Sequence, residues 1–358
     1  MIILGIETSC DETAVAIIEN GRKILANVVA SSIKLHQKTG GIIPEIAARE
    51  QLKYIVPAIK EALEKSKLKP EDLDALAVTS GPGLIGSLLI GVETAKALAF
   101  VWQKPLIPIN HLQGHLYANW LNLENAEPKF PAIGLVVSGG HTDLILMKNH
   151  SRIKWLGGTR DDAAGECFDK CARLLSLGYP GGPAIAAAAA KCETRNEKRE
   201  TQDKKDFTFR VSPITSHDIK LPRPMIREDN FDFSFSGLKT AVFNKLKEQE
   251  SRRVRINIPE MAYEIQEAIT DVLVAKTKKA AEKFKVKSVL LAGGVTANPR
   301  LREKFKLSII NYQLSIPEQK LCTDNATFVA SCAYFNFHPL LSQKIFADSS
   351  LEIEEMIK

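Results

Sequence analysis

The sequence predicts an α/β protein made of two similar halves. Residues 2–19 are predicted to form two short strands joined by a polar turn, and residues 133–147 repeat this plan around a glycine-rich turn. Two long stretches, at about 44–66 and 259–284, carry apolar residues at helical spacing. Strands that end in glycine-rich turns alternate with these helices, and this alternation is typical of α/β architecture.

Length, charge and cysteine content narrow the class of protein. The chain of 358 residues is long enough for two ordinary domains or one large two-lobed domain. A formal net charge of +6 is compatible with a polyanionic partner but does not require one. The six cysteines include no C-x-x-C pair, which suits a reducing compartment, so we expect a cytoplasmic protein.

No segment of the sequence is predicted to enter a membrane. The first residues contain no basic segment or cleavage-like site, so we expect no signal peptide. The uncharged stretch 75–92 is long enough to span a bilayer, but the sequence SGPGLIG interrupts it. We therefore expect a strand, a glycine turn and a helix there.

Two histidines four residues apart, His111 and His115, are candidate metal ligands. In a helix capped by Asn110 they would share one face, with Cβ atoms roughly 5–6 Å apart. The spacing resembles the metalloprotease signature H-E-x-x-H, but Leu112 stands where that signature needs its catalytic glutamate. Two imidazoles with one carboxylate would suit ferrous iron, and zinc is an alternative. The other interpretation is that one histidine packs or caps while the other lies at the surface.

Asp324 and three glycine turns are further candidates for a ligand site. Asp324 precedes a predicted helix, so it is either an N-cap or the missing metal carboxylate, and sequence spacing does not decide between them. The glycine turns at 138–140, 181–182 and 293–294 could bring backbone N–H groups close to a phosphate, although glycine pairs also mark ordinary turns. Together with the polar turn at 8–13, they predict a nucleotide cleft between two lobes.

The chain also contains a pair of helical thiols and a charged run. Cys167 and Cys171 are predicted to be buried free thiols rather than metal ligands. Asp169 could form a solvated pair with Lys170 or accept a hydroxyl group of a ligand. Residues 191–206 mix charges of both signs without an apolar period. We expect a solvated loop or an exposed helix there, with an RNA-contacting arm as the alternative.

Nine short motifs are spread over nearly the whole chain. In order they are GIETSCDETAVAI (5–17), TSGPGLIGSLLIGVETAKALA (79–99), NHLQGH (110–115), VSGGHT (137–142), GECFDK (165–170), YPGGP (179–183), FSFSGLKT (233–240), GGVTAN (293–298) and CTDN (322–325). This ordered set resembles the tRNA adenosine threonylcarbamoyltransferases, in their bacterial and organellar branch. That family was formerly described as O-sialoglycoprotein endopeptidases.

The resemblance implies a two-lobed fold of the actin, sugar-kinase and Hsp70 type, called the ASKHA fold, with duplicated ribonuclease-H-like lobes. Residues 1–125 would form the N-terminal lobe, joined by the C-terminal helical segment 326–358. Residues 126–325 would form the C-terminal lobe, with a charged insertion at about 190–223. This insertion is longer than is usual in the family, so contacts with tRNA or a partner are expected to differ there.

The resemblance also implies an acyltransferase. Members of the family transfer the threonylcarbamoyl group from threonylcarbamoyl-adenylate to the exocyclic N6 amine of the adenosine next to the anticodon, in tRNAs that read codons beginning with A. They release AMP. The implied partners are tRNA, a separate synthase that makes the adenylate, a smaller homologous scaffold subunit and an ATPase helper protein. No membrane partner is expected.

Two alternative functions are compatible with the same fold. A small-molecule or sugar kinase would turn over ATP and would need no histidine pair. A non-catalytic scaffold paralogue would be expected to lose the metal ligands, whereas His111, His115 and Asp324 are all present. Fold alone does not decide among the three functions.

The resemblance assigns a metal site and an acidic pair to individual residues. His111, His115 and Asp324 match the ligands of one divalent metal ion, with Fe²⁺ favoured and Zn²⁺ or Mg²⁺ as alternatives. Asp11 and Glu12 match a catalytic acidic pair near the reacting end of the substrate.

The resemblance also assigns an adenylate site in the C-terminal half. His141 would be a further ligand or a proton carrier. Some members of the family carry an acidic residue at the position of Ala186, so one contact to the ribose is expected to be missing. The positions that match the adenylate-binding residues of the family are Val136, Val137, Ser138, Gly139, Gly140, Asp169, Gly182 and Asn298.

Overall fold

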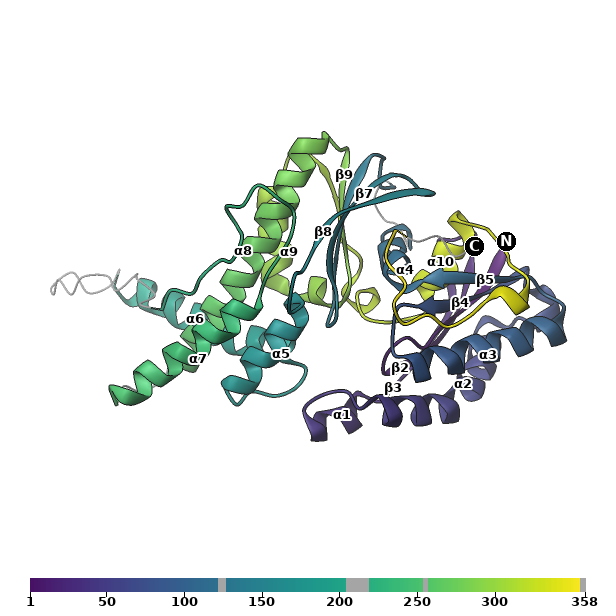
Figure 1. Ribbon diagram of the computed structural model, residues 1–358, viewed down its shortest axis with the longest axis horizontal. Helices are drawn as coiled ribbons and strands as arrows, with labels where there is room; N and C mark the ends of the chain where they lie inside the picture. The colour runs from purple at the N-terminus through teal and green to yellow at the C-terminus, as the bar shows by residue number, and fades with distance from the viewer. Residues whose placement is uncertain (122–126, 204–218, 254–256, 355–358) are drawn as a thin grey trace.

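Two lobes, each built on a five-stranded mixed sheet, make up the molecule (Figure 1). The computed structural model describes residues 1–121, 127–203, 219–253 and 257–354. The lobes meet near the short helix α4 His111–Tyr117, which follows the first sheet directly (Figure 1).

The sheet of the N-terminal lobe begins with the predicted hairpin. Its strands are β1 Ile2–Glu7, β2 Glu12–Glu19, β3 Lys23–Ser31, β4 Ala75–Gly81 and β5 Leu106–Asn110. In the order β3-β2-β1-β4-β5, the first three strands are antiparallel neighbours, while β4 and β5 run parallel to β1. The central strands are apolar on both faces because helices cover the sheet from both sides.

The sheet of the C-terminal lobe repeats this pairing strand for strand. Its strands are β6 Ala132–Val137, β7 Thr142–Asn149, β8 Arg152–Gly158, β9 Ser288–Ala292 and β10 Gln313–Ser315. β6, β7 and β8 are antiparallel neighbours, while β9 and β10 run parallel to β6. The order β8-β7-β6-β9-β10 matches β3-β2-β1-β4-β5, so the predicted duplicated ASKHA fold is confirmed.

Helices from two distant parts of the chain cover the first sheet. α2 Pro44–Ser66 and α3 Ile85–Trp102 lie on one face, and α10 Thr327–Phe335 lies on the other. α2 has the bounds that its apolar spacing predicts, with a proline in its first turn and Pro57 in its interior. The short helix α1 Ile33–Thr39 lies between β3 and α2 in the chain. Because α10 follows the second sheet, the first lobe is completed by residues that come after the second.

In the described part of the chain, α3 is the helix that is long and apolar enough to cross a membrane. A helix in the core of a globular lobe passes the same test. Here α3 packs on β4 and α2, and a side chain added at Gly91 would overlap the Thr8 hydroxyl. The strand, glycine turn and helix predicted at 75–92 are β4, the turn after it and the first part of α3.

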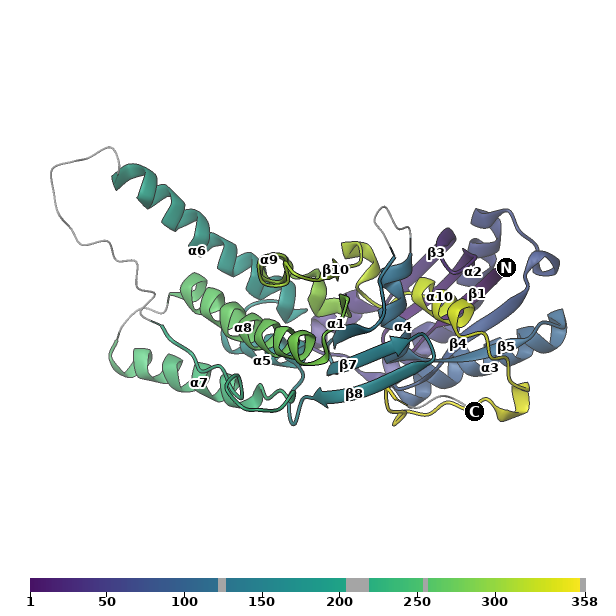
Figure 2. The same ribbon diagram turned by 90° about the horizontal axis from the view of Figure 1, so that it is seen from above.

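The helices of the C-terminal lobe pack on its sheet and extend beyond it (Figure 2). Residues 191–203 of the predicted charged run belong to the helix α6, whereas 204–206, like the rest of the predicted insertion up to 218, lie outside the described residues. Cys167 and Cys171 are buried free thiols, as predicted. The helices are α5 Ala164–Leu174, α6 Gly181–Asp203, α7 Ser236–Ser251, α8 Ile258–Phe284 and α9 Pro299–Ser308.

A cluster of buried apolar residues joins the two lobes around α4. It includes Leu116 of α4, Ile145 of β7, Leu290 of β9 and Phe328 of α10. Both sheets therefore contribute to one core, and α4 lies within it.

The segment after α10 is tied to the start of α4. The side-chain amide of Asn110 donates a hydrogen bond to the carbonyl of Glu352 (2.8 Å), and that of Gln113 donates to the carbonyl of Ile353 (2.7 Å). These bonds fix α4 at its first turn.

Candidate functional site

α4 positions the two predicted histidines where β5 ends. The Asn110 side-chain oxygen accepts hydrogen bonds from the backbone N–H groups of Leu112 (3.0 Å) and Gln113 (3.2 Å), so Asn110 caps the helix as predicted. The rings of His111 and His115 lie on one helical face, with centroids 4.6 Å apart. His115 is fully buried and His111 is 6% exposed, so neither is a surface histidine.

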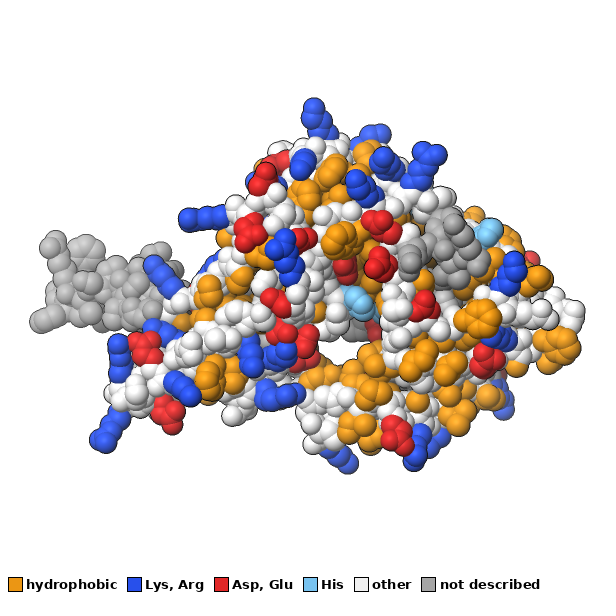
Figure 3. Space-filling view, viewed as in Figure 1, with side chains coloured by type: hydrophobic (Ala, Val, Ile, Leu, Met, Phe, Trp, Pro, Cys, Tyr) orange, Lys and Arg blue, Asp and Glu red, His pale blue; other side chains and the backbone are white. Residues whose placement is uncertain are grey.

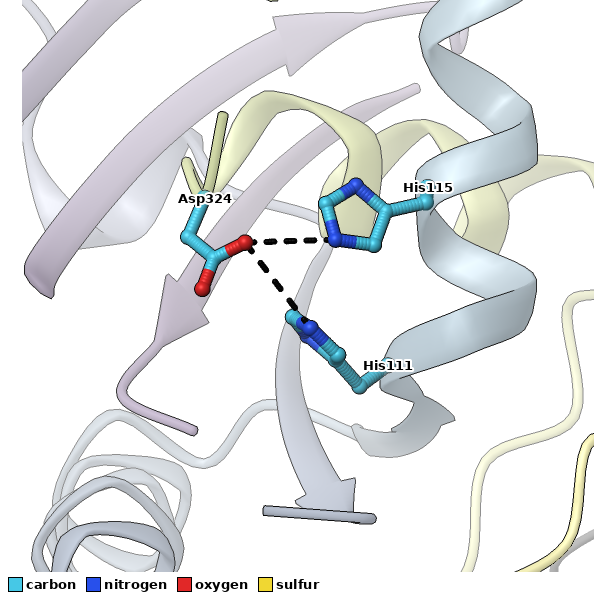
Figure 4. Close-up of side chains that lie close together, drawn as sticks. All are labelled: His111, His115 and Asp324. Atoms are coloured by element: carbon cyan, nitrogen blue, oxygen red, sulfur yellow. Dashed lines mark ion pairs between the residues drawn. The ribbon is translucent and has the colours of Figure 1, made fainter. Parts of the chain in front are cut away.

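Asp324 lies opposite the two rings (Figure 4). Its Oδ1 atom is 3.2 Å from His115 Nε2 and 3.8 Å from His111 Nε2. The N-cap interpretation of Asp324 is wrong, because Asn325 Oδ1 accepts the hydrogen bond from Thr327 N (3.1 Å) at the start of α10. The structure therefore brings together one ligand atom from each of the three predicted residues, all within 4.8 Å of one another.

Neighbouring charges determine the ionisation of this cluster. Burial would lower the pKa of His111, but the carboxylates of Glu7 and Asp324 raise it to about 9. Burial would raise the pKa of Asp324, but His111 and His115 lower it to about 2. Burial lowers the pKa of His115. Near neutral pH and without a metal ion, Asp324 is therefore charged, His115 is neutral and His111 is protonated on both ring nitrogens. Asp324 and His115 are already in the forms that bind a metal ion, whereas His111 would release its Nε2 proton on binding.

The residues of the cluster fit a divalent metal ion. His115 is fully buried, yet neither of its ring nitrogens has a hydrogen-bond partner among the described residues. A buried polar atom without a partner is costly, and a cation bound to Nε2 would satisfy it. Two imidazole nitrogens and one carboxylate oxygen form a donor set that suits Fe²⁺ or Zn²⁺. The cluster is therefore a candidate metal site.

The turn of the N-terminal hairpin carries the predicted acidic pair, Asp11 and Glu12. Asp11 is 8% exposed, and its backbone carbonyl accepts a hydrogen bond from Ser32 Oγ (2.8 Å). Burial and the negative charges of Asp324 and Asp11 raise the pKa of Glu12 well above its usual range. The turn that carries the acidic pair meets the candidate metal site at Ser9, whose Oγ atom lies 3.1 Å from His111 Nδ1.

The turn of the C-terminal hairpin is open and rich in glycine. Ser138 N donates a hydrogen bond to His141 O (2.9 Å), and His141 N donates to Ser138 Oγ (3.1 Å), which closes the turn. Gly139 and Gly140 are exposed, and no atom lies within 4 Å of the place where a Cβ would stand on either. This turn, which follows Val136 and Val137 at the end of β6, can therefore present backbone N–H groups to an anion.

Glycines bring two other segments against this hairpin. Gly293 has a φ of 89°, and a Cβ there would overlap the backbone of Val137. A Cβ at Gly165, in the first turn of α5, would overlap the backbone of Ser138. The turn after β9 and the start of α5 therefore close around the end of β6.

His141 lies near the candidate metal site but outside the ligand set. Burial, and then the neighbouring imidazoles of His111 and His115, lower the pKa of His141 to about 4. In the part of the chain that the structure describes, the atoms that gather closely enough to bind one ion belong to His111, His115 and Asp324. The neutral ring of His141 leaves the role of proton carrier open to it.

Asp169 and Lys170 do not form the solvated pair that was one of their predicted alternatives. Lys170 Nζ pairs instead with Asp162 (2.6 Å), which precedes α5, and with Glu166 (2.9 Å), which lies one turn earlier in the helix. Asp169 Oδ1 accepts a hydrogen bond from Gly181 N (2.6 Å). Asp169 therefore joins α5 to the start of α6.

Gly182 and Asn298, the last two predicted adenylate positions, differ in what surrounds them. Nothing lies within 4 Å of the place where a Cβ would stand on Gly182. The Asn298 side chain is engaged, because its oxygen accepts from Leu301 N (3.0 Å) and its amide donates to Gln266 Oε1 (2.9 Å). Asn298 therefore caps α9 and fixes the turn that begins at Gly293.

Figure 3 shows that the surface is hollowed where the two lobes meet, with acidic side chains at the edge of the hollow.

The family model for tRNA N6-adenosine threonylcarbamoyltransferase matches residues 23–331 of this chain. The chain belongs to this family.

Known relatives that carry the name tRNA N6-adenosine threonylcarbamoyltransferase match nearly the full length of this family member. The protein from Thermomicrobium roseum is 45% identical over 99% of this chain and 95% of its own. The protein from Syntrophomonas wolfei is 47% identical over 94% of this chain and 92% of its own. The protein from Bacillus anthracis is 47% identical over 92% of this chain and 90% of its own.

Among solved structures, full-length HypF in the phosphate- and nucleotide-bound form superposes on this threonylcarbamoyltransferase-family chain with a TM-score of 0.56. The match covers 94% of this chain and 55% of that chain, at 11% identity. At this identity the likeness concerns the fold alone, and it agrees with the two-lobed arrangement of the sheets.

Gln51 of α2 is a functional candidate that the sequence analysis missed. Its side-chain amide donates to the carbonyls of Thr8 (3.3 Å), Cys10 (2.9 Å) and Glu12 (3.0 Å), so it holds the turn of the N-terminal hairpin. The sequence pattern that could have identified Gln51 is a polar residue on the apolar face of a helix, one turn before Ile55.

Glu7 is the second residue that was missed. It ends the otherwise apolar strand β1, it is fully buried, and its Oε2 atom is 3.1 Å from His111 Nδ1. A charged residue at the end of a buried strand was the available signal, because such a residue needs a partner.

Proposed function

We propose that this chain transfers the threonylcarbamoyl group from threonylcarbamoyl-adenylate to the exocyclic N6 amine of the adenosine next to the anticodon, in tRNAs that read codons beginning with A, with release of AMP. Membership of the family and the names of its relatives support this activity. The observation that carries it is the convergence of His111, His115 and Asp324, because neither a kinase nor a scaffold would need this set.

We propose that the three residues hold one divalent ion, with Fe²⁺ favoured. Zn²⁺ accepts the same donors, whereas Mg²⁺ prefers oxygen ligands and fits less well. When bound, the ion would supply Lewis-acid polarisation of the carbamoyl group and would stabilise negative charge on the phosphate that leaves. Asp324, with its lowered pKa, brings a negative charge to the site at every pH near neutrality.

The acidic pair is proposed to handle the proton of the attacking amine. When the N6 nitrogen bonds to the carbonyl carbon, the bond from that carbon to the phosphate oxygen breaks and the nitrogen must lose a proton. In its ionised form, a carboxylate with a raised pKa is a stronger base for this proton than an ordinary carboxylate. Glu12 has such a raised pKa, and Asp11 beside it contributes to it.

The adenylate is proposed to bind against the C-terminal hairpin. Backbone N–H groups of the open turn at Gly139 and Gly140 would face its phosphate, while Ser138, whose own N–H donates to His141 O, would close the turn. Among the described residues Asp169 uses one carboxylate oxygen for Gly181, which leaves the other to accept a hydrogen bond from a ribose hydroxyl. Asn298 would shape the base pocket through the turn that it fixes, rather than with its own engaged amide.

The partners are proposed to be tRNA, the synthase that makes the adenylate, a smaller homologous subunit and an ATPase helper, all in the cytoplasm.

We propose that the smaller subunit binds an apolar surface on α2 and α3. It includes Leu52 and Val56 (both 66% exposed), Phe100 (75%) and Val101 (71%), and hydrophobic side chains gather over this lobe in Figure 3. A homologous subunit would carry the same helix pair, so the two pairs could pack like against like. Val56→Glu should prevent co-elution of the two proteins, and unchanged co-elution would contradict the assignment.

The activity is tested by nucleoside mass spectrometry of tRNA. Purified protein is supplied with threonine, bicarbonate, ATP, the synthase, the helper proteins and tRNA. We expect threonylcarbamoyladenosine from the wild type and none from His111→Ala or Asp324→Ala. His338→Ala removes an exposed histidine away from the cluster and should retain activity. Full modification by the first two variants would refute the metal assignment, and sugar or small-molecule phosphorylation without tRNA modification would favour a kinase.

A further inference from the structure

A buried carboxylate lies directly behind the candidate metal site. Glu7 is the last residue of β1, and its side chain is fully buried. The other five residues of the strand are apolar or glycine. Burying a carboxylate without partners would be strongly unfavourable, so the contacts of Glu7 show what it is there to hold.

Three donors from different segments converge on Glu7. Ser9 N donates a hydrogen bond to Oε1 (2.6 Å), and the Thr79 hydroxyl of β4 donates to Oε2 (2.6 Å). His111 Nδ1 lies 3.1 Å from the same Oε2 atom. Both oxygens are therefore engaged, and the carboxylate is fixed by the hairpin turn, by the neighbouring strand and by α4.

The contact with Glu7 distinguishes the two ring nitrogens of His111. An ionised carboxylate only accepts hydrogen bonds, so the nitrogen that faces it, Nδ1, must carry the proton. The other nitrogen, Nε2, is the one that lies 3.8 Å from Asp324 Oδ1. A histidine can offer its lone pair to a metal ion only at the nitrogen that has no proton.

We propose that Glu7 is a positioning residue that holds His111 in the Nδ1–H tautomer and orients its Nε2 lone pair toward the metal. This inference rests on the proposed metal site. Glu7 does not touch the ion or the substrate in this arrangement, and it acts only through the His111 ring. Partners of this kind commonly contribute about 10–100-fold to metal affinity.

The two histidines of the pair are not equivalent in this respect. His115 has no hydrogen-bond partner at either ring nitrogen among the described residues, and its nearest charged neighbour is Asp324, at 3.2 Å. His111 is therefore the ligand whose orientation is fixed before a metal ion binds. His115 would be oriented by packing against Phe328, whose ring centroid is 4.5 Å from its own, and by the ion.

Ser9 offers a competing explanation for the tautomer. Its hydroxyl oxygen also lies 3.1 Å from His111 Nδ1. A hydrogen bond to an ionised acceptor is stronger than one to a neutral hydroxyl, so Glu7 should dominate. Ser9→Ala separates the two explanations because it keeps the carboxylate.

The test measures metal affinity rather than activity. The full-length protein is stripped of metal and titrated with Zn²⁺ in competition with a chromophoric chelator. Glu7→Gln should weaken Zn²⁺ binding by about 10–100-fold, and Ser9→Ala should weaken it less. Glu264→Gln is the matched control, because Glu264 is a buried carboxylate of α8 that pairs with Arg223 and accepts a hydrogen bond from Leu221 N. The Zn²⁺ affinity of this variant should equal that of the wild type.

The tautomer itself is read by long-range ¹H–¹⁵N NMR of histidine-labelled, Zn²⁺-loaded protein. The wild type should show a protonated His111 Nδ1 and a metal-bound Nε2, and Glu7→Gln should lose the slowly exchanging Nδ1 proton. If Glu7→Gln does not fold, Thr79→Val is tested instead. Thr79→Val removes one hydrogen-bond donor to the Glu7 carboxylate and should weaken Zn²⁺ binding by a few-fold.

Three results would overturn the inference. They are a metal bound through Nδ1, equal Zn²⁺ affinity of Glu7→Gln (or of Thr79→Val in its place) and the wild type, and a larger loss from Ser9→Ala than from Glu7→Gln. If the wild type itself bound no metal ion, the proposed metal site would fail instead, so the two failures are distinguishable.

Discussion

The two hairpins occupy the same place in two copies of one sheet, yet their turns are opposite in character. The N-terminal turn, between Glu7 and Glu12, is largely buried and carries ionisable side chains. The C-terminal turn, between Val137 and Thr142, is half-buried at Ser138 and His141 and has two exposed glycines at its tip. Both turns contain four residues, so length does not distinguish them. The duplicated fold thus provides one turn with acidic side chains, the N-terminal one, and one turn with accessible backbone N–H groups, the C-terminal one.

The largest effect should come from neutralising the N-terminal turn. Glu12→Gln and Asp11→Asn each remove a carboxylate that is proposed to accept the amine proton, so kcat/KM should fall by about 10²–10⁴-fold. Rates of tRNA modification measured by nucleoside mass spectrometry check this. Asp229→Asn, at a side chain that is 94% exposed, is the control and should leave the rate unchanged. A Glu12→Gln enzyme with wild-type rates would remove the functional difference between the turns.

A bulky residue at Gly293 should disrupt the base of the C-terminal turn. Gly293→Val combines a left-handed φ with overlap of the Val137 backbone, and it should lower the free energy of unfolding by about 3 kcal/mol. Urea unfolding followed by circular dichroism measures this loss. A stability equal to that of the wild type would show that the turn after β9 can move away from β6.

The next largest effect on stability is expected at Gln51, the residue of α2 that holds the N-terminal turn. Gln51→Leu leaves three carbonyl oxygens of the hairpin without their donor, which should cost about 2 kcal/mol of unfolding free energy. The same urea experiment applies. Gln113→Leu is unsuitable as its control because the Gln113 side chain also forms a structural hydrogen bond. Gln37→Leu, at an exposed position of α1, should change stability by less than about 0.5 kcal/mol.

The smallest effect on stability is expected at the tip of the C-terminal turn. Gly140→Ala adds a Cβ where no atom lies within 4 Å, so the free energy of unfolding should change by less than about 0.5 kcal/mol. The same methyl group would stand in the path of a phosphate, so KM for the adenylate should rise while kcat is retained. Loss of stability without a change in KM would indicate a structural turn rather than a binding turn.

Local patterns in the sequence predicted the elements that short-range physics determines. The apolar spacing of 44–66 gave the bounds of α2, and the cap at Asn110 gave the shared face of His111 and His115. Both results depend on residues within a few positions of each other. The hairpin repeat was visible for the same reason.

Contacts between distant segments could not be derived in this way. Asp324 is far from α4 in the sequence and meets its histidines only in the folded structure, so spacing left its N-cap role open and the family resemblance supplied the assignment. Lys170 has several carboxylates close to it in the sequence, and its pairing with Asp162 and Glu166 depends on how the start of α5 folds. The role of Glu7 was missed because the apolar residues of β1 are enough to predict a buried strand, and the prediction does not depend on one charged residue at its end.

The position of α10 has a consequence for how the protein is made on the ribosome. The first strand of the N-terminal lobe packs on a helix that is translated only after the whole second sheet, since Gly5 meets the backbone of Ala326 and Ala330. Until then one face of the first sheet has no cover, and exposed apolar strands are prone to aggregation. The nascent N-terminal lobe therefore needs protection for most of its synthesis, and the histidine pair can be enclosed only when translation is nearly complete.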